Sequence, residues 1–88
     1  MSTASPVLNF TSLSGGAVSA EYANLPQGSN IVFVNQTSGQ KYPGIGAAGG
    51  GTVTIKVPAA APAGAYYLEA TDKSGAYLAQ TVVFQLAK

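Results

Sequence analysis

Few side chains in this sequence are suited to catalysis. The acids are Glu21, Glu69 and Asp72, the only basic side chains are four lysines, and there is no histidine, cysteine or arginine. Serine–histidine and cysteine–histidine nucleophile pairs therefore cannot form. Glu69 and Asp72 are three residues apart at the end of a predicted strand, so their side chains should point to opposite faces instead of forming a carboxylate pair. We predict a protein that is not an enzyme and has no catalytic residue. A small hydrolase using Glu69 or Asp72 is the least supported alternative.

Metal binding lacks ligands as well. Residues 72–75 read Asp-Lys-Ser-Gly and offer one carboxylate and one hydroxyl, whereas Ca²⁺ takes roughly six to eight oxygen ligands. The absence of cysteine also excludes thiolate metal sites and disulfides. We therefore expect residues 72–75 to form a hairpin turn, and we predict no metal site.

A glycine pattern matches the dinucleotide-binding fingerprint G-x-G-x-x-G. It covers residues 44–49, Gly-Ile-Gly-Ala-Ala-Gly. The motif binds a dinucleotide only between a strand and a helix, because the helix N-terminus receives the pyrophosphate. Here it leads through two more glycines into a predicted strand, so no βαβ unit fits. We expect a flexible loop and no cofactor.

Three tyrosines are the candidate contact residues for a ligand or partner: Tyr42, Tyr67 and Tyr77. Tyr67 should face outward if its neighbour Tyr66 faces inward, and Tyr77 should lie across a hairpin from Tyr67. Such side chains can stack on sugar rings or anchor a protein partner. The alternative is an ordinary cross-strand aromatic pair that stabilises the hairpin.

Charge and length narrow the classes of partner. Charged residues are 8% of the 88-residue chain and the net charge is +1, so we predict no nucleic-acid partner, which would need a cluster of cations. A weakly charged surface resists association poorly, so we expect a monomer or a weak homo-oligomer with an unidentified protein or glycan partner. The length allows one domain, residues 1–88, and the 47% apolar content can supply its core.

Strand signals separated by turn residues fill this domain, and no segment favours a helix. Strands are predicted at 7–10, 17–22, 31–34, 52–57, 65–71 and 77–86, with a short edge strand near Lys41 as a seventh. Val82, Phe84 and Leu86 should share one inward face. We expect residues 1–5 to be disordered, 24–30 to be a loop, and 35–51 to be a long, mobile, glycine-rich loop. The fold class predicted is all-β, an immunoglobulin-like antiparallel β-sandwich of about seven short strands.

A family resemblance supports that fold. Residues 62–75, Pro-Ala-Gly-Ala-Tyr-Tyr-Leu-Glu-Ala-Thr-Asp-Lys-Ser-Gly, resemble the penultimate hairpin of immunoglobulin-like modules in bacterial surface proteins. The other strand motifs occur in an order similar to that in Kre9/Knh1-like cell-wall domains. The resemblance implies that Tyr66 is a tyrosine corner, with its hydroxyl bonded back to the backbone near the start of its strand.

The same resemblance implies an extracellular, periplasmic or cell-surface location. The first six residues have neither the basic region nor the apolar core of a signal peptide, so the cytoplasm is the alternative. Prolines and a glycine interrupt the most apolar stretch, 57–70, and we predict no transmembrane segment. The function expected is that of a non-enzymatic interaction or structural module, with a carbohydrate-binding module that uses the exposed tyrosines as the alternative.

Overall fold

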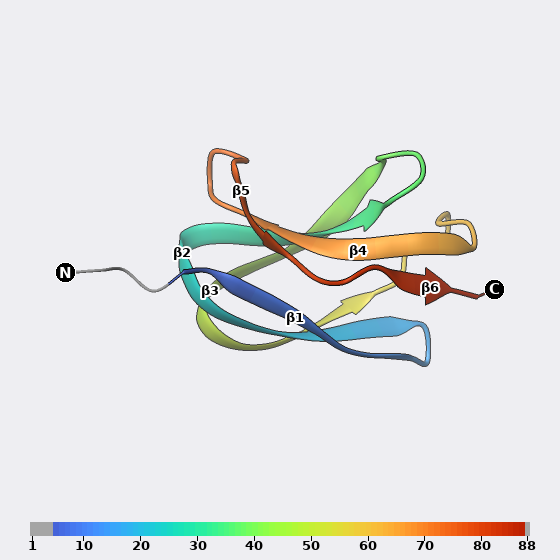
Figure 1. Cartoon of the computed structure of the whole chain (residues 1–88), viewed down its shortest axis with the longest axis horizontal. Helices are drawn as coiled ribbons and strands as arrows, with labels where there is room; N and C mark the ends of the chain where they lie inside the picture. The colour runs from blue at the N-terminus through green and yellow to red at the C-terminus, as the bar shows by residue number, and fades with distance from the viewer. Residues whose placement is uncertain (1–4, 88) are drawn as a thin grey trace.

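The computed structural model describes residues 5–87, which form six strands and no helix (Figure 1). The strands are β1 (Val7–Ser14), β2 (Ala17–Asn35), β3 (Lys41–Lys56), β4 (Gly64–Thr71), β5 (Tyr77–Gln80) and β6 (Phe84–Leu86). Every strand pair is antiparallel. The prediction of an all-β antiparallel protein is therefore confirmed.

Strand β2 holds the sheet together. One of its edges pairs with β3 along nearly its whole length, from Ala17 opposite Lys56 to Val34 opposite Lys41. The other edge pairs with β1 in the first half of β2 and with β4 in the second half. β4 in turn pairs with β5 and β6. Because β2 changes neighbour halfway, the single sheet curls into a half-barrel (Figure 1). The immunoglobulin-like sandwich of two separate sheets stays a prediction.

The glycine-rich segment is a strand, and the prediction of a long loop over 35–51 is wrong. The short edge strand predicted near Lys41 is present as the start of β3. Residues 41–56 pair with β2, and only residues 36–40 form a turn between the two strands. The Asn35 side chain organises this turn, since its Oδ1 accepts hydrogen bonds of 2.9 Å from the amides of Thr37 and Ser38. Gly49 lies between two register shifts and has a φ of +73°. Glycines at such bulges let the strand bend without leaving the sheet.

The predicted loop over 24–30 is likewise part of β2. Register shifts on both sides of Leu25 absorb its turn-like residues, and Asn24 (φ 62°) and Gly28 (φ 83°) have left-handed backbone there. Asn24 Nδ2 also donates a 3.0 Å hydrogen bond to the carbonyl of Ser5. Disorder is predicted for residues 1–5. Of these, Ser5 accepts the hydrogen bond just described, and residues 1–4 lie outside the described residues.

Aromatic rings link five of the strands through one core inside the curl. Phe33 of β2 is fully buried and stacks on Tyr66 of β4, with the ring centroids 4.6 Å apart. The Phe33 ring is also tilted against the rings of Tyr42 in β3 and Phe84 in β6, with a centroid distance of 6.0 Å in each case. Phe84 stacks in turn on Phe10 of β1 at 4.9 Å. Buried aliphatic side chains surround these rings: Leu8, Val18, Ala20, Leu25, Ile31, Val53, Ile55, Leu68, Ala70 and Leu86.

The last predicted strand is interrupted, which corrects the predicted position of Val82. Phe84 and Leu86 are buried, but Val82 is 71% exposed, so the prediction that it shares their inward face is wrong. The cause is Thr81, whose Oγ1 accepts a hydrogen bond from the Leu68 amide at 3.0 Å and donates one to the Val82 carbonyl. This side chain takes the place of a backbone partner and separates β5 from β6.

The hydrogen bond predicted between the Tyr66 hydroxyl and the backbone near the start of its strand is confirmed. Its hydroxyl donates a 2.5 Å hydrogen bond to the carbonyl of Pro62, four residues earlier and just before β4 begins. The side chain is fully buried. Tyr66 therefore anchors the segment that leads into β4 to the ring cluster around Phe33.

Candidate functional site

The three candidate tyrosines do not form one surface. Tyr42 is opposite Phe33 in the β2–β3 pair and only 9% exposed, so its predicted exposure is wrong. Tyr67 is half-buried and lies opposite Val34, whereas Tyr77 is 59% exposed and lies opposite Thr71. Tyr67 and Tyr77 are therefore not a cross-strand pair, and that prediction is wrong too. Tyr77 comes directly after the hairpin turn and pairs with Thr71 at the end of β4, four residues along that strand from Tyr67.

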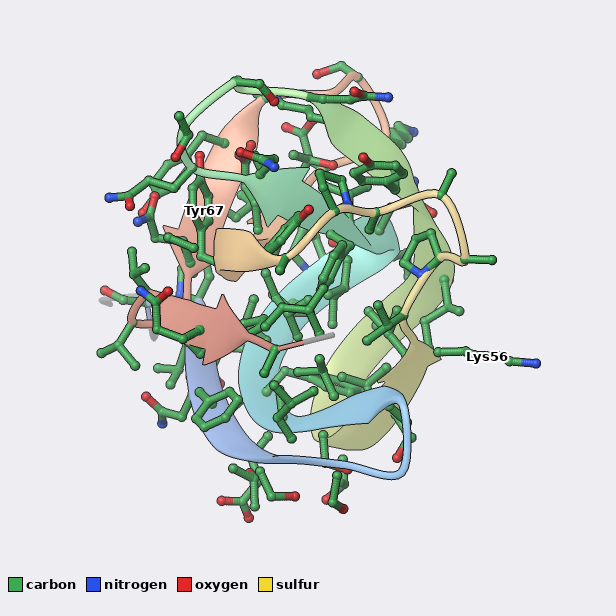
Figure 2. All side chains as sticks on the ribbon, turned by 90° about the vertical axis from the view of Figure 1, so that its right-hand side faces the viewer. Lys56 and Tyr67 are labelled. Atoms are coloured by element: carbon green, nitrogen blue, oxygen red, sulfur yellow. The ribbon has the colours of Figure 1, made fainter. Side chains whose placement is uncertain are left out.

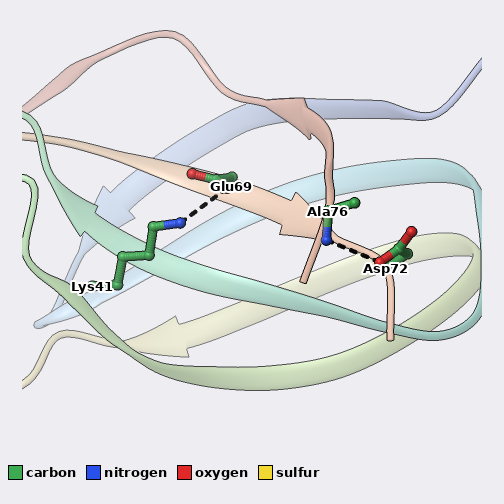
Figure 3. A network of polar contacts seen from close by, with 4 residues as sticks. All are labelled: Lys41, Glu69, Asp72 and Ala76. Carbon is green, nitrogen blue, oxygen red and sulfur yellow. Dashed lines mark hydrogen bonds and ion pairs between the residues drawn. The ribbon is translucent and has the colours of Figure 1, made fainter. Parts of the chain in front are cut away.

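Two of the three carboxylates are engaged with different partners. Glu69 is buried and pairs with Lys41 at 3.4 Å, whereas Asp72 binds groups of its own turn (Figure 3). Asp72 Oδ1 accepts hydrogen bonds from the Ser74 hydroxyl at 2.6 Å and the Ala76 amide at 3.0 Å. These two bonds, the Ser74 bond first, hold the pKa of Asp72 below its ordinary value of 3.8. Each acid therefore has a structural role, and the turn predicted at 72–75 is present.

The third carboxylate, Glu21, lies in a surface depression. Glu21 is exposed on the outer face of the sheet, in a row with Asn9 of β1 and Thr52 of β3. The depression has a volume of about 340 Å³ and is lined by Val7, Asn9, Glu21, Tyr22, Ala23, Gly51 and Thr52. Sequence reasoning missed it because these residues meet only through the register of three strands.

The G-x-G-x-x-G pattern is part of a strand, and one of its glycines packs closely against the neighbouring strand. It lies within β3, and a Cβ atom at Gly44 would overlap the carbonyl of Ile31 in β2. At Gly46 the nearest atom to such a Cβ is the Ser29 carbonyl oxygen, at 3.8 Å. Only the first of these glycines is therefore required by a close approach of backbones. The strand-to-helix setting of a dinucleotide site does not occur within residues 5–87.

The clearest unpartnered element is the outer edge of β3. In the part of the chain that the structure describes, β3 pairs with β2 alone. Its last six residues, 51–56, pair with residues 17–22 without a register shift, and we call them the edge segment. Within it Thr54 and Lys56 are exposed while Val53 and Ile55 are buried. Figure 2 shows the Lys56 side chain extending away from the body of the molecule.

The sequence predicted this strand, with its Thr-Val-Thr-Ile-Lys alternation, but not its position in the sheet. Whether a strand lies at the edge of a sheet depends on which strands flank it. The local sequence pattern of residues 51–56 carries no such information. The buried Val53 and Ile55 and the outward Thr54 and Lys56 agree with the predicted alternation.

Comparison with protein-family models, with curated proteins and with solved structures finds no match for this chain. Residues 5–87 hold no group of three or more side chains suited to binding a metal ion. The same residues contain no helix long and apolar enough to cross a membrane. The candidate functional site is therefore the edge segment with the neighbouring depression.

Proposed function

We propose that this protein is a non-enzymatic interaction module that binds an extended polypeptide strand along its edge segment, residues 51–56. The observation that carries this proposal is the regular pairing of those residues with β2 on one side, with no strand among residues 5–87 on the other. An unpaired strand edge presents a row of backbone N–H and C=O groups to any chain that can align with it.

The composition of the edge segment suits strand addition. Thr52, Val53, Thr54 and Ile55 are β-branched and hold an extended backbone well. Natural edges are usually protected by bulges, prolines or charges. β3 has its register shifts in residues 42–51, whereas residues 51–56 have none and carry one charge, Lys56. The segment is therefore the part of this edge that is least protected against pairing.

The proposal extends to the fold family and the location. We infer an immunoglobulin-like relationship, which the Tyr66–Pro62 hydrogen bond supports because tyrosine corners are typical of such domains. The extracellular, periplasmic or cell-surface location rests on the resemblance of residues 62–75 to bacterial surface modules. Fractionation of the source cells tests it. The carbohydrate-binding alternative lacks its expected tyrosine platform, because Tyr42 is buried and Tyr67 and Tyr77 are separate.

Titration with a model strand tests the proposal. The probe is a short end-capped peptide of alternating threonine and valine between terminal lysines, followed by amide NMR spectra of the whole chain. We expect chemical-shift changes to concentrate at residues 51–56, and some of their amides to gain protection from hydrogen exchange. The unshifted control is the outer edge of β1, residues 7–14. Absence of shifts at a large peptide excess, or shifts confined to another strand, would refute strand addition at this edge.

A further inference from the structure

We infer that the strand added to the edge segment is the edge segment of a second copy of this chain, arranged about a twofold axis at Thr54. This inference rests on the proposed function and names the partner. Within residues 5–87, Lys41 pairs with Glu69, and Asp72 binds its own turn. Glu21 is then the one exposed carboxylate there without such a partner, and it lies beside the edge segment.

The edge segment is self-complementary about Thr54. Antiparallel pairing about an axis at this residue sets Thr54 opposite Thr54 of the second copy. It also sets Val53 opposite Ile55 and Thr52 opposite Lys56. Residues that face each other across antiparallel strands share one face of the sheet. The buried Val53 and Ile55 therefore continue both cores, and the outward side chains of both copies stay on the outer face.

This register brings Lys56 of the second copy close to Glu21. Thr52 already lies opposite Glu21 within each chain, so Lys56 of the second copy, Thr52 and Glu21 form one row across three strands. Neighbouring strands are about 4.8 Å apart, so the backbones of these two charged residues are separated by about 10 Å. A lysine and a glutamate side chain together can span that distance over Thr52. The twofold axis repeats the ion pair, and the two Lys56 side chains never face each other.

The surface depression makes room for this contact. Its lining includes Glu21 and Thr52 on the outer face, together with Asn9 and the apolar side chain of Val7. An extended lysine can lay its aliphatic stem along such a surface while its ammonium group reaches the carboxylate. In the single chain Lys56 is opposite Ala17, four pairs along the strands from Glu21, and the two charges stay apart.

The expected dimer is weak, because a short edge contact buries less than about 1,200 Å². Sedimentation velocity of the full chain over a concentration series at low salt detects it. The mean mass should rise from 8.8 kDa toward twice that value. A chain that stays at 8.8 kDa up to its solubility limit would overturn the inference.

Two substitutions of the same residue test the axis. Thr54 is exposed, so Thr54→Lys and Thr54→Glu should both fold, which urea unfolding verifies. Each variant alone sets like charges against each other on the axis and should raise the dimer Kd several-fold. An equimolar mixture of the two should dimerise again, because opposite charges then meet. Thr37→Lys, in the turn between β2 and β3, is the matched control and should associate like the unmodified chain.

The ion pair is tested by exchanging its charges. Glu21→Lys or Lys56→Glu alone should weaken the dimer several-fold, and both substitutions in one chain should restore it. A dimer indifferent to charge at Thr54, or a mixture that does not recover, would overturn this register. A monomeric chain whose edge segment still binds the threonine–valine peptide would refute only the second copy as partner. A chain that binds neither would refute the proposed function as well.

Discussion

Replacing Tyr66 by phenylalanine removes one oxygen atom from the core and leaves the ring in place. The lost group is the hydroxyl that donates to the Pro62 carbonyl at 2.5 Å. The stacking of the ring on Phe33, with a centroid distance of 4.6 Å, should survive. Tyr66→Phe therefore isolates the contribution of the corner hydrogen bond from that of the fully buried ring.

The structure sets the size of the expected effect. A typical intramolecular hydrogen bond contributes about 1 kcal/mol net, and an acceptor left buried without a partner costs roughly 1–3 kcal/mol. Pro62 is exposed, so water can reach part of the freed carbonyl and reduce that penalty. We expect Tyr66→Phe to lower the free energy of unfolding by about 1–2 kcal/mol. Tyr66→Ala also empties the space of the ring and should cost about 3–5 kcal/mol.

Urea unfolding followed by circular dichroism measures both effects. With an m-value of about 1 kcal/mol/M, typical of a small domain, the midpoint of Tyr66→Phe should fall by about 1–2 M. Tyr77→Phe is the matched control, because Tyr77 is 59% exposed. It should stay within about 0.5 kcal/mol of the unmodified chain. Equal stabilities for Tyr66→Phe and Tyr77→Phe would refute the assignment of a stabilising tyrosine corner.

Two further predictions concern the glycine pattern and the acidic turn. Gly44→Ala should destabilise the fold by several kcal/mol or prevent folding, because its Cβ would overlap the Ile31 carbonyl. Gly46→Ala, the control, should change the free energy of unfolding by about 1 kcal/mol or less. Similar thermal midpoints for the two variants would contradict the close approach of β3 to β2 at Gly44. The pKa of Asp72 is lowered in the folded state, so its contribution is present above the unfolded pKa and is lost as the pH falls through the folded pKa. The thermal midpoint should therefore decline below about pH 4, and less steeply in Asp72→Asn; parallel pH profiles would show that the turn does not depend on this carboxylate.

Local patterns predicted much of the secondary structure. The alternation at 52–57 and the turn at 72–75 occur as expected, because each depends on residues close together in sequence. The hydrogen bond of the Tyr66 hydroxyl, which the family resemblance implied, is also present. The two wrong loop predictions share one cause. The glycine-rich segment and residues 24–30 have the composition of loops, yet pairing between β2 and β3 holds both in the sheet. Backbone hydrogen bonding to a distant strand overrides local preference, and a sequence window does not contain that strand.

The features of the candidate site also fall into two groups, those that local sequence determines and those that the register between strands determines. Sequence by itself determined the chemistry available: three carboxylates, four lysines and no histidine or cysteine, whatever the fold. It also determined that residues 52–57 favour a strand with alternating faces. Only the tertiary structure decided that this strand lies at an edge, that Tyr42 is buried and that Glu21 lies beside Thr52. The physical reason is that a side chain's face follows from its own strand, whereas its neighbours follow from the register between strands far apart in the chain.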